Sequence, residues 1–338
     1  MQQKLRILAA SVAAVAFASV ITAGSGVASA EDKAPAGSGL RAGNVLPGKA
    51  ADGGIGIQSS SSGANSADFT GDGRPDILAR QADNGVLKVY PHSGSFSGTS
   101  TFQPSININY GWGGFRWIGT AFVNADQRPD VVGIDGDGTM RVYPHSGTFN
   151  GTSTLTSPTV LGYGWNINDL VLFGDFTGDG YSDIIARRTG GDIAYLYQHN
   201  GVLAGTSTYS APVALVYGVR NTVELNMAEV TRDGFPDLVF LEPASTLGVF
   251  SFVDGPTDPE TGYPTGWSWP LGYGWNIMNA VTLSEVNGDG VVDILGRRQN
   301  GELYVYPHSG NWDANNSTAT LISPTYLGAG WNTNNVIS

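Results

Sequence analysis

The nine residues DFTGDGYSD, Asp175–Asp183, belong to a motif that occurs five times in this chain and decides its fold. The other copies read DFTGDGRPD at Asp68–Asp76, VNADQRPD at Val123–Asp130, EVTRDGFPD at Glu229–Asp237 and EVNGDGVVD at Glu285–Asp293. Their closing aspartates are residues 76, 130, 183, 237 and 293, so the steps are 54, 53, 54 and 56 residues. A period of this length is typical of a toroid, a solenoid or an array, in which function lies at positions that repeat.

Repeat 3 shows the composition of one unit. Its short apolar runs are rich in β-branched and aromatic residues, are bounded by turn formers, and lie at Leu170–Phe173, Asp183–Arg187, Ile193–Tyr197 and Pro212–Val216. Four short strands in each unit of about fifty residues predict one blade of a β-propeller. Helical periodicity is absent from the repeats, which excludes an α-solenoid.

The two ends of the repeat region predict ring closure. The chain stops at GWNTNNVIS, Gly330–Ser338, whereas the matching GWNINDLVL, Gly164–Leu172, leads straight into the next Asp/Gly loop. The first loop, at Asp68, has only a fragment of strand before it. We therefore predict that the C-terminal segment completes the first blade and removes an exposed sheet edge. Residues 64–338 are predicted to form an all-β fold, a five-bladed β-propeller of four-stranded blades with an N/C-terminal clasp.

The N-terminus has the pattern of a secretory signal peptide. Lys4 and Arg6 precede the apolar stretch Ile7–Ile21, and Ala28-Ser29-Ala30 is an A-x-A cleavage site. Residues 1–30 are therefore predicted to be a signal peptide, and the protein to be secreted, extracellular and not inserted into a membrane. Residues 31–63 are rich in Gly, Ser, Ala and Pro, and are expected to be a flexible leader, either a spacer or a linker to a partner.

Charge and cysteine content narrow the choice of partners. The net charge is −12, and removing the two bases of residues 1–30 makes it −14. This argues against nucleic acid and anionic membranes as partners, and it suits a protein that holds cations. The chain has no cysteine, so disulfides cannot stabilise it outside the cell. Ring closure and bound metal are the stabilising devices that we expect instead.

The Asp/Gly loops have the ligand spacing of a calcium site. Oxygen-bearing side chains occupy loop positions 1, 3, 5 and 9, a glycine usually occupies position 6, and position 7 offers a carbonyl, as in an EF-hand loop without its glutamate at position 12. The candidate Ca²⁺ ligands are Asp68, Thr70, Asp72, Arg74 and Asp76; Asp175, Thr177, Asp179, Tyr181 and Asp183; Glu229, Thr231, Asp233 and Asp237; and Glu285, Asn287, Asp289 and Asp293. Repeat 2 has Phe122 and Gln127 at positions 1 and 6, and is predicted to bind nothing. The alternative is an Asx-type turn, in which the aspartates accept bonds from backbone N–H groups.

Other repeated side chains are candidate ligand contacts. The third strand ends in YPHSG or YQHNG, a GYGWN-like turn follows the fourth strand, and an arginine follows the second strand in three repeats. The candidate contacts are His92, His145, His199 and His308; Tyr90, Tyr143 and Tyr306; Trp112, Trp165, Trp275 and Trp331; and Arg80, Arg187 and Arg297. Aromatic faces combined with fixed hydrogen-bonding groups are what a sugar requires. The alternatives are a turn in which the imidazole bonds to the backbone, and tryptophans that pack blades together. Repeat 4 has Val253 where histidine is expected, and repeat 3 has Val219 in place of tryptophan.

The loop, the short strands and the turn together resemble the FG-GAP/VCBS repeat family of secreted or cell-surface β-propellers. The motifs that carry the resemblance read GDGRPDILAR, GVLKVYPHSG and GYGWNIN, and they are similar to the actinobacterial type. The resemblance implies calcium in the DxxGDGxxD loops, and five-bladed members of this shape resemble tachylectin-like lectins. Fold likeness alone does not establish that function.

Three classes of function are compatible with these sequence features. The first is a secreted, calcium-stabilised, lectin-like propeller that binds glycans of a cell wall or cell surface through repeated inter-blade sites. The second is a non-catalytic protein-interaction or targeting subunit, with a cell-surface or secreted protein as partner and with the insertion Gly255–Trp269 as a possible contact. The third is a glycan-active enzyme. The chain lacks G-x-S-x-G, H-E-x-x-H and any cysteine nucleophile, so we predict no catalytic activity.

Overall fold

The computed structural model describes residues 40–43, 68–256, 259 and 265–337. The predicted signal peptide, residues 1–30, and most of the predicted leader, 31–63, lie outside the described residues. Within the described part of the chain, no helix is long and apolar enough to cross a membrane.

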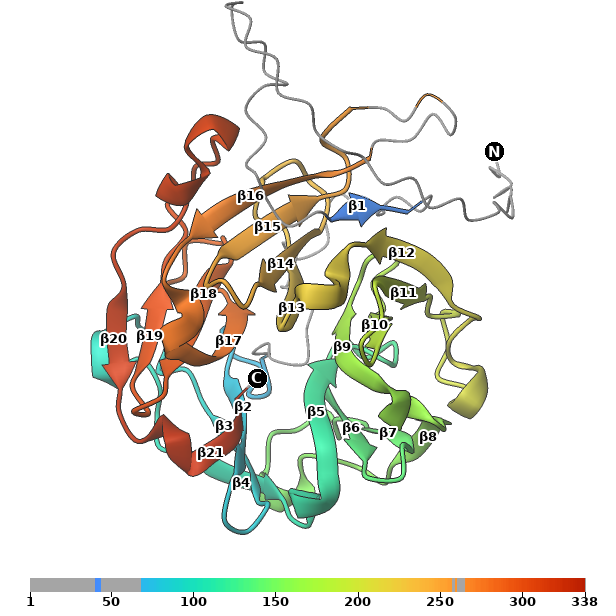
Figure 1. The fold of residues 1–338 in the computed structure, drawn as a ribbon. Coiled ribbons are helices and arrows are strands. Elements are labelled where there is room, and N and C mark those ends of the chain that lie inside the picture. Colours follow the sequence, from blue (N-terminus) through green and yellow to red (C-terminus); the bar gives the residue numbers. More distant parts are fainter. Residues whose placement is uncertain (1–39, 44–67, 257–258, 260–264, 338) are drawn as a thin grey trace, which may run out of the picture. The chain divides into compact units, whose positions relative to one another are not determined.

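Five antiparallel sheets form the blades of a β-propeller, which confirms the predicted fold class (Figure 1). From the innermost to the outermost strand, blade 1 is β21 (Asn334–Ile337), β2 (Ile77–Gln81), β3 (Leu87–Tyr90) and β4 (Ile106–Asn109). Blade 2 is β5 (Phe115–Ala121), β6 (Asp130–Asp135), β7 (Met140–Tyr143) and β8 (Thr159–Gly162). Blade 3 is β9 (Asn168–Gly174), β10 (Asp183–Arg188), β11 (Ile193–Tyr197) and β12 (Val213–Tyr217).

Blades 4 and 5 repeat the same order. Blade 4 is β13 (Glu224–Ala228), β14 (Asp237–Leu241), β15 (Leu247–Ser251) and β16 (Trp267–Gly272). Blade 5 is β17 (Met278–Ser284), β18 (Asp293–Arg298), β19 (Leu303–Tyr306) and β20 (Thr325–Gly328). The Asp/Gly loops therefore join the first strand to the second in blades 2–5, and in blade 1 the loop precedes the second strand, β2.

Short 3₁₀ helices lie in two of the connections. One set follows the outermost strand and leads into the next blade: η3 (Trp112–Gly114), η5 (Trp165–Ile167), η7 (Val219–Asn221), η8 (Trp275–Ile277) and η10 (Trp331–Thr333). The other set precedes the outermost strand: η2 (Gly98–Ser100), η4 (Gly151–Ser153), η6 (Gly205–Ser207) and η9 (Ala314–Ala319). In the first set the preceding residue is a glycine in the left-handed region, for example Gly164 at φ 73°, where other residues would be strained.

The predicted clasp is confirmed. The C-terminal β21 pairs antiparallel with β2, with Ile337 opposite Ala79 and Val336 opposite Arg80. The last strand of the chain is thus the innermost strand of the first blade, so the first and last repeats share one sheet. An additional strand, β1 (Arg41–Ala42), pairs with β12 and makes the sheet of blade 3 five-stranded. Residues 41 and 42 belong to the segment 31–63, for which we predicted a flexible leader and no strand.

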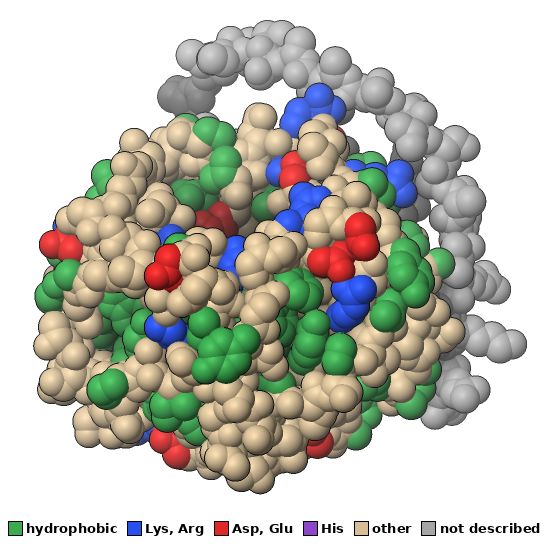
Figure 2. Space-filling view, turned by 90° about the horizontal axis from the view of Figure 1, so that it is seen from below, with side chains coloured by type: hydrophobic (Ala, Val, Ile, Leu, Met, Phe, Trp, Pro, Cys, Tyr) green, Lys and Arg blue, Asp and Glu red, His purple; other side chains and the backbone are tan. Residues whose placement is uncertain are grey.

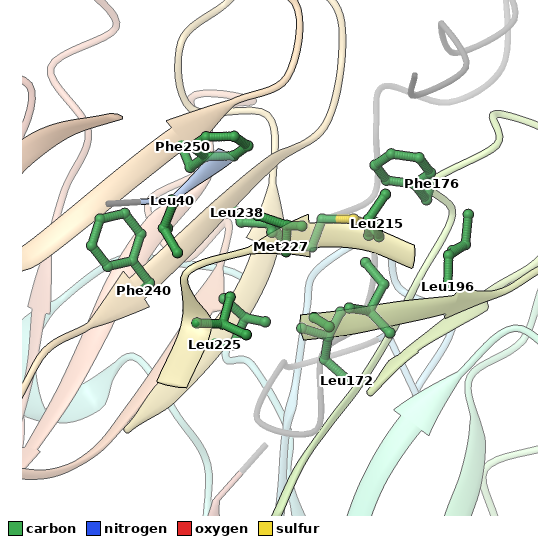
Figure 3. Close-up of a cluster of buried hydrophobic side chains, with 14 of the residues drawn as sticks. Leu40, Leu172, Phe176, Leu196, Leu215, Leu225, Met227, Leu238, Phe240 and Phe250 are labelled. Carbon is green, nitrogen blue, oxygen red and sulfur yellow. The ribbon is translucent and has the colours of Figure 1, made fainter. Parts of the chain in front are cut away.

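The hydrophobic core lies between the blades. Each of its five clusters joins side chains of two neighbouring blades, and the cluster between blades 3 and 4 includes Leu172, Leu215, Leu225 and Phe240 (Figure 3). No blade buries its apolar faces alone, so each sheet depends on both of its neighbours. The strand alternation that exposes one side of an ordinary antiparallel sheet is therefore weak here.

The clasp is expected to contribute measurably to stability. Ile337 is 3% exposed and packs in the cluster between blades 5 and 1. Ile337→Ala should lower the free energy of unfolding by about 2–4 kcal/mol, because it removes buried methyl groups and leaves a cavity. Ile322→Ala is the control, because Ile322 is 51% exposed and its change should stay within about 0.5 kcal/mol. Denaturant unfolding measures both, and equal midpoints would contradict the role of the clasp.

Candidate functional site

Every Asp/Gly loop is organised around its closing aspartate. These side chains are almost fully buried, at 0–1% exposure: Asp76, Asp130, Asp183, Asp237 and Asp293. In blade 3, Asp183 Oδ2 accepts the N–H groups of Phe176 and Thr177 at 3.0 and 2.9 Å, and its Oδ1 accepts the N–H of His199 at 2.8 Å. The carboxylate therefore joins the first loop of a blade to the end of its third strand.

The first acid of the loop binds the loop's own backbone. Asp175 Oδ1 accepts the N–H groups of Gly178 and Asp179 at 2.7 and 3.0 Å, and its Oδ2 accepts that of Gly180 at 2.9 Å. Gly180 has φ 89°, which explains the glycine at loop position 6. Asp68 makes the same three contacts in repeat 1. This is the Asx-turn arrangement that the sequence left open beside calcium.

Burial and crowding keep the loop carboxyls from ionising easily. Burial raises the pKa of Asp76, Asp183 and Asp293 to about 7, and the other acids of the same loop raise it further, against the backbone hydrogen bonds that lower it. Burial also raises the pKa of Asp237 well above its usual value. A bound cation would relieve this repulsion.

The residues around two of these loops leave oxygen atoms free for such a cation. Thr177 Oγ1 and Glu229 Oε1, at predicted ligand positions 3 and 1, are buried without a hydrogen-bond partner. By contrast, Thr70, Thr231 and Asn287 bond to carboxylates of their own loops. Within the described residues, no three His, Cys, Asp or Glu side chains form a group that could hold a metal ion. The candidate set depends on hydroxyl and carbonyl oxygens as well.

The four histidines lie buried between blades, at 0–5% exposure. Each Nε2 lies 3.0–3.2 Å from a backbone carbonyl of the Asp/Gly loop in the preceding blade, as His145 does with Phe69 and His199 with Val123. Each Nδ1 accepts the N–H of the glycine two residues later at 2.9–3.0 Å. Burial lowers the pKa of all four imidazoles. Both nitrogens thus bond within the protein, which is the structural alternative for this position.

Strand register corrects the alignment of repeat 4. Tyr197 pairs with Ile184 and precedes His199 by two residues, whereas the corresponding pair in blade 4 is Phe250 with Leu238. Phe252, and not Val253, therefore occupies the histidine position. Its ring meets that of Phe176 edge-on at 5.0 Å, so an aromatic contact replaces the hydrogen bond to the preceding blade.

The repeated tryptophans pack on tyrosines of the following blade. Their ring centroids lie 4.6–5.0 Å apart in the pairs Trp112–Tyr143, Trp165–Tyr197, Trp275–Tyr306 and Trp331–Tyr90. Three of the tryptophans are 1–8% exposed and Trp165 is half-buried, as are the tyrosines. These contacts are those of the packing alternative.

The three arginines connect each odd-numbered blade to the next. Arg187 Nε donates to Asp169 on its own innermost strand at 2.9 Å, and its Nη1 donates to the carbonyl of Thr222, which leads into blade 4, at 2.8 Å. Arg80 and Arg297 make equivalent contacts with Asn335 and Asn279 and with the carbonyls of the next connection. All three are 6–8% exposed.

Blades 2 and 4 are connected to the next blade by other side chains, which were not among the predicted site residues. In blade 2, Arg116 donates from the innermost strand to the carbonyls of Asn166 and Asn168. In blade 4, Glu224 Oε1 accepts the N–H of Val281 at 3.1 Å, so it caps the backbone of the innermost strand of blade 5. Burial raises the pKa of Glu224 to about 7, while the bond from Val281 and the charge of Arg297 lower it.

A tyrosine two residues before the tryptophan is another repeated position, and it was not among the predicted site residues. Tyr110, Tyr163 and Tyr273 lie between the outermost strand and the 3₁₀ helix and are 60, 71 and 70% exposed. The letters Tyr-Gly before three of the tryptophans are a signal in the sequence for this position. The turns in which they lie are at the opposite end of the strands from the Asp/Gly loops, because antiparallel strands alternate their ends.

Comparison with known proteins supports the repeat. A model of the FG-GAP-like repeat matches residues 123–186. No sequence among the curated proteins matches this chain.

Solved structures with low identity are similar in fold. An Agrocybe aegerita lectin, described for specific recognition of non-reducing terminal N-acetylglucosamine, is 15% identical over 81% of this chain and 82% of its own, with a TM-score of 0.45. BBS1N in complex with ARL6DN, soaked with lead, is 14% identical over 83% and 86%, with a TM-score of 0.36. Its counterpart soaked with mercury is 13% identical over 82% and 86%, with a TM-score of 0.33. At these values the likeness carries no argument about function.

Glu224 predicts a pH dependence of stability. Its folded pKa of about 7 exceeds the ordinary value of 4.5, so the folded state retains a proton that the unfolded state loses. The free energy of unfolding should therefore fall as pH rises from about 4.5 to about 7. Glu224→Gln keeps an acceptor for the Val281 N–H and cannot ionise. Relative to wild type it should gain stability across this window, by at most about 3 kcal/mol.

Urea unfolding at pH 5 and pH 8 measures this effect. Asp83→Asn, an exposed carboxyl between β2 and β3, is the control. An identical difference between Glu224→Gln and wild type at both pH values would contradict the prediction.

Proposed function

We propose that this protein is an exported, non-catalytic glycan-binding propeller whose sugar contacts are the tyrosines of the turns between blades. The observation that carries the proposal is the exposure of Tyr110, Tyr163 and Tyr273 at one repeated position. Each exposed tyrosine presents an apolar ring face and a polar hydroxyl, which together suit stacking and hydrogen bonding with a sugar. The secretory pattern of residues 1–30 supports export.

The surroundings of these tyrosines suit a sugar ring. A Cβ added at Gly111, Gly164 or Gly274, the residue after each tyrosine, would meet nothing within 4 Å, so one side of the turn is open. Exposed Asn166 and Asn276 follow three residues after Tyr163 and Tyr273, and they offer amide groups to hydroxyls. An aromatic face stacks on the C–H side of a sugar, and the polar groups fix its orientation.

The number of intact turns limits the number of sites to three. Blade 3 has half-buried Tyr217, which pairs with Arg41 of β1, and blade 5 has Ala329. Blades 1, 2 and 4 retain the exposed tyrosine. Three sites on one rigid ring would bind a repetitive glycan with higher avidity than any one site. Figure 2 shows small hydrophobic patches that interrupt an otherwise mostly polar surface.

The glycan proposal predicts partial losses that add up. After a glycan array has identified a sugar class, calorimetric titration of wild type should give about three sites per chain. Tyr163→Ala should remove one site and leave the melting temperature unchanged, because the ring is exposed. Tyr326→Ala is the control, since this tyrosine is 38% exposed but lies in β20, outside the turns. No sugar bound by folded protein, or equal loss in both variants, would overturn the proposal.

We also propose that the Asp/Gly loops hold calcium. In repeat 3 the ion would be held by Asp175, Thr177, Asp179, Tyr181 through its carbonyl, and Asp183. The unpartnered Thr177 Oγ1 and the mutual repulsion of the acids support this assignment. Bound calcium would supply positive charge and stabilise the loop, with the weak affinity, on the order of 10⁻⁴–10⁻³ M, of extracellular sites.

Calcium should therefore raise the melting temperature, and EDTA should reverse the rise. Asp179→Asn should reduce the calcium-dependent shift by removing a charged ligand, while its side chain can still accept the Tyr181 N–H at 2.9 Å. Asp126→Asn in repeat 2 is a matched control, because Asp126 accepts the Arg128 N–H at the same distance in a loop predicted to bind nothing. Equal calcium-dependent shifts in the two variants would count against the proposed site.

A further inference from the structure

A segment outside the repeats is built into the ring between blades 3 and 4. Strand β1 lies antiparallel along β12, with Arg41 opposite Tyr217 and Ala42 opposite Val216. The Gly43 N–H bonds to the carbonyl of Leu215 on β12. The Ala42 N–H bonds to the carbonyl of Thr265, in the insertion of blade 4, at 2.9 Å. The segment is therefore bonded to two blades through its backbone.

Its anchor is Leu40. This side chain is 7% exposed and belongs to the cluster that joins blades 3 and 4. Figure 3 shows it beside Phe250 and Phe240. Burying a leucine side chain removes apolar surface from water, so the contact can hold a short segment in place.

This interface is the one that lacks the tryptophan. At the other four interfaces a tryptophan packs on a tyrosine of the next blade. Blade 3 has the smaller Val219, and blade 4 has Phe250 in place of the tyrosine. The missing volume must be filled, because protein interiors are close-packed. Leu40 supplies an apolar side chain to this cluster from outside the repeats.

Blade 4 is altered at matching positions. Phe240 occupies the place of Ala79, Gly133, Ala186 and Gly296 in the other blades. Opposite it, Gly248 replaces larger residues, and a Cβ there would lie 2.3 Å from the Phe240 ring. The exchange of large and small residues moves an aromatic ring into the cluster that receives Leu40.

The backbone of β12 also restricts the sequence of its partner. A Cβ on Gly43 would lie 2.5 Å from the carbonyl oxygen of Ala214 and 2.9 Å from that of Leu215. These are backbone atoms in a sheet and cannot move away cheaply. Only glycine fits at this position, and the apolar cluster takes the leucine three residues before it.

We propose that the edge of β12, together with Phe240 and Phe250, is a peptide-binding site selective for the extended segment Leu40–Gly43. The chain's own leader occupies it by strand addition, which satisfies edge N–H and C=O groups that would otherwise face solvent. The bound segment takes over at this interface the role that tryptophan has at the other four. A mature chain beginning at Glu31 retains the segment.

The test uses the complete mature chain. Leu40→Asp places a charge in the apolar cluster and should lower the melting temperature by roughly 2–6 °C. Val202→Asp, which changes an apolar side chain of blade 3 that is 58% exposed, should not. A synthetic peptide of residues 37–45 added to the Leu40→Asp protein should bind with one-to-one stoichiometry and restore the melting temperature, whereas the same peptide with Gly43→Val should not.

Hydrogen exchange on the unmodified protein keeps the proposal testable if the variant fails to fold. The amides of Ala42 and Gly43 should exchange far more slowly than an unstructured peptide. Fast exchange there would overturn the proposal. So would equal melting temperatures of Leu40→Asp and Val202→Asp, or equal rescue by the two peptides.

Discussion

The buried aspartate that closes each Asp/Gly loop is the constraint on which the rest of the ring depends. A carboxylate that is 0–1% exposed is tolerable only when hydrogen bonds replace its lost hydration. In blade 3, Asp183 gathers the backbone of its own loop on one oxygen and the N–H of His199 on the other. That contact places the imidazole so that it reaches the carbonyl of Val123 in the preceding blade. One buried carboxyl group thus positions a loop, a strand end and an inter-blade contact.

Most of the residues that repeat most faithfully serve this architecture. The histidines, tryptophans and arginines, for example His199, Trp275 and Arg187, are directed at neighbouring blades and find their partners within the protein. Their recurrence follows from the recurrence of the interface. The exposed tyrosines, by contrast, contribute little to packing and leave their rings open to solvent. For this reason the proposed glycan contacts lie in the turns.

The interface between blades 3 and 4 lacks the tryptophan and histidine contacts that the other four interfaces share. Val219 replaces the tryptophan, and Phe252 replaces the histidine and meets the ring of Phe176 edge-on. The leader enters at this same interface through Leu40. A closed ring needs every interface to be stable, because one open interface exposes the apolar faces of two sheets to water. The departures are concentrated where a segment from outside the repeats compensates for them.

The sequence by itself determined the number of blades, the strand content and the clasp. The repeat period, the turn residues and the unmatched ends at Asp68 and Ser338 can be read along the chain without knowledge of tertiary contacts. It also limited the loops to two alternatives, calcium ligands or Asx turns. Only the tertiary structure decided which face each repeated side chain presents. A histidine that contacts a sugar and one that bonds to a carbonyl about 76 residues away have the same letters around them. Register in blade 4, the displaced Arg116 and the insertion of Leu40 likewise depend on contacts between distant segments, and burial is set by those contacts.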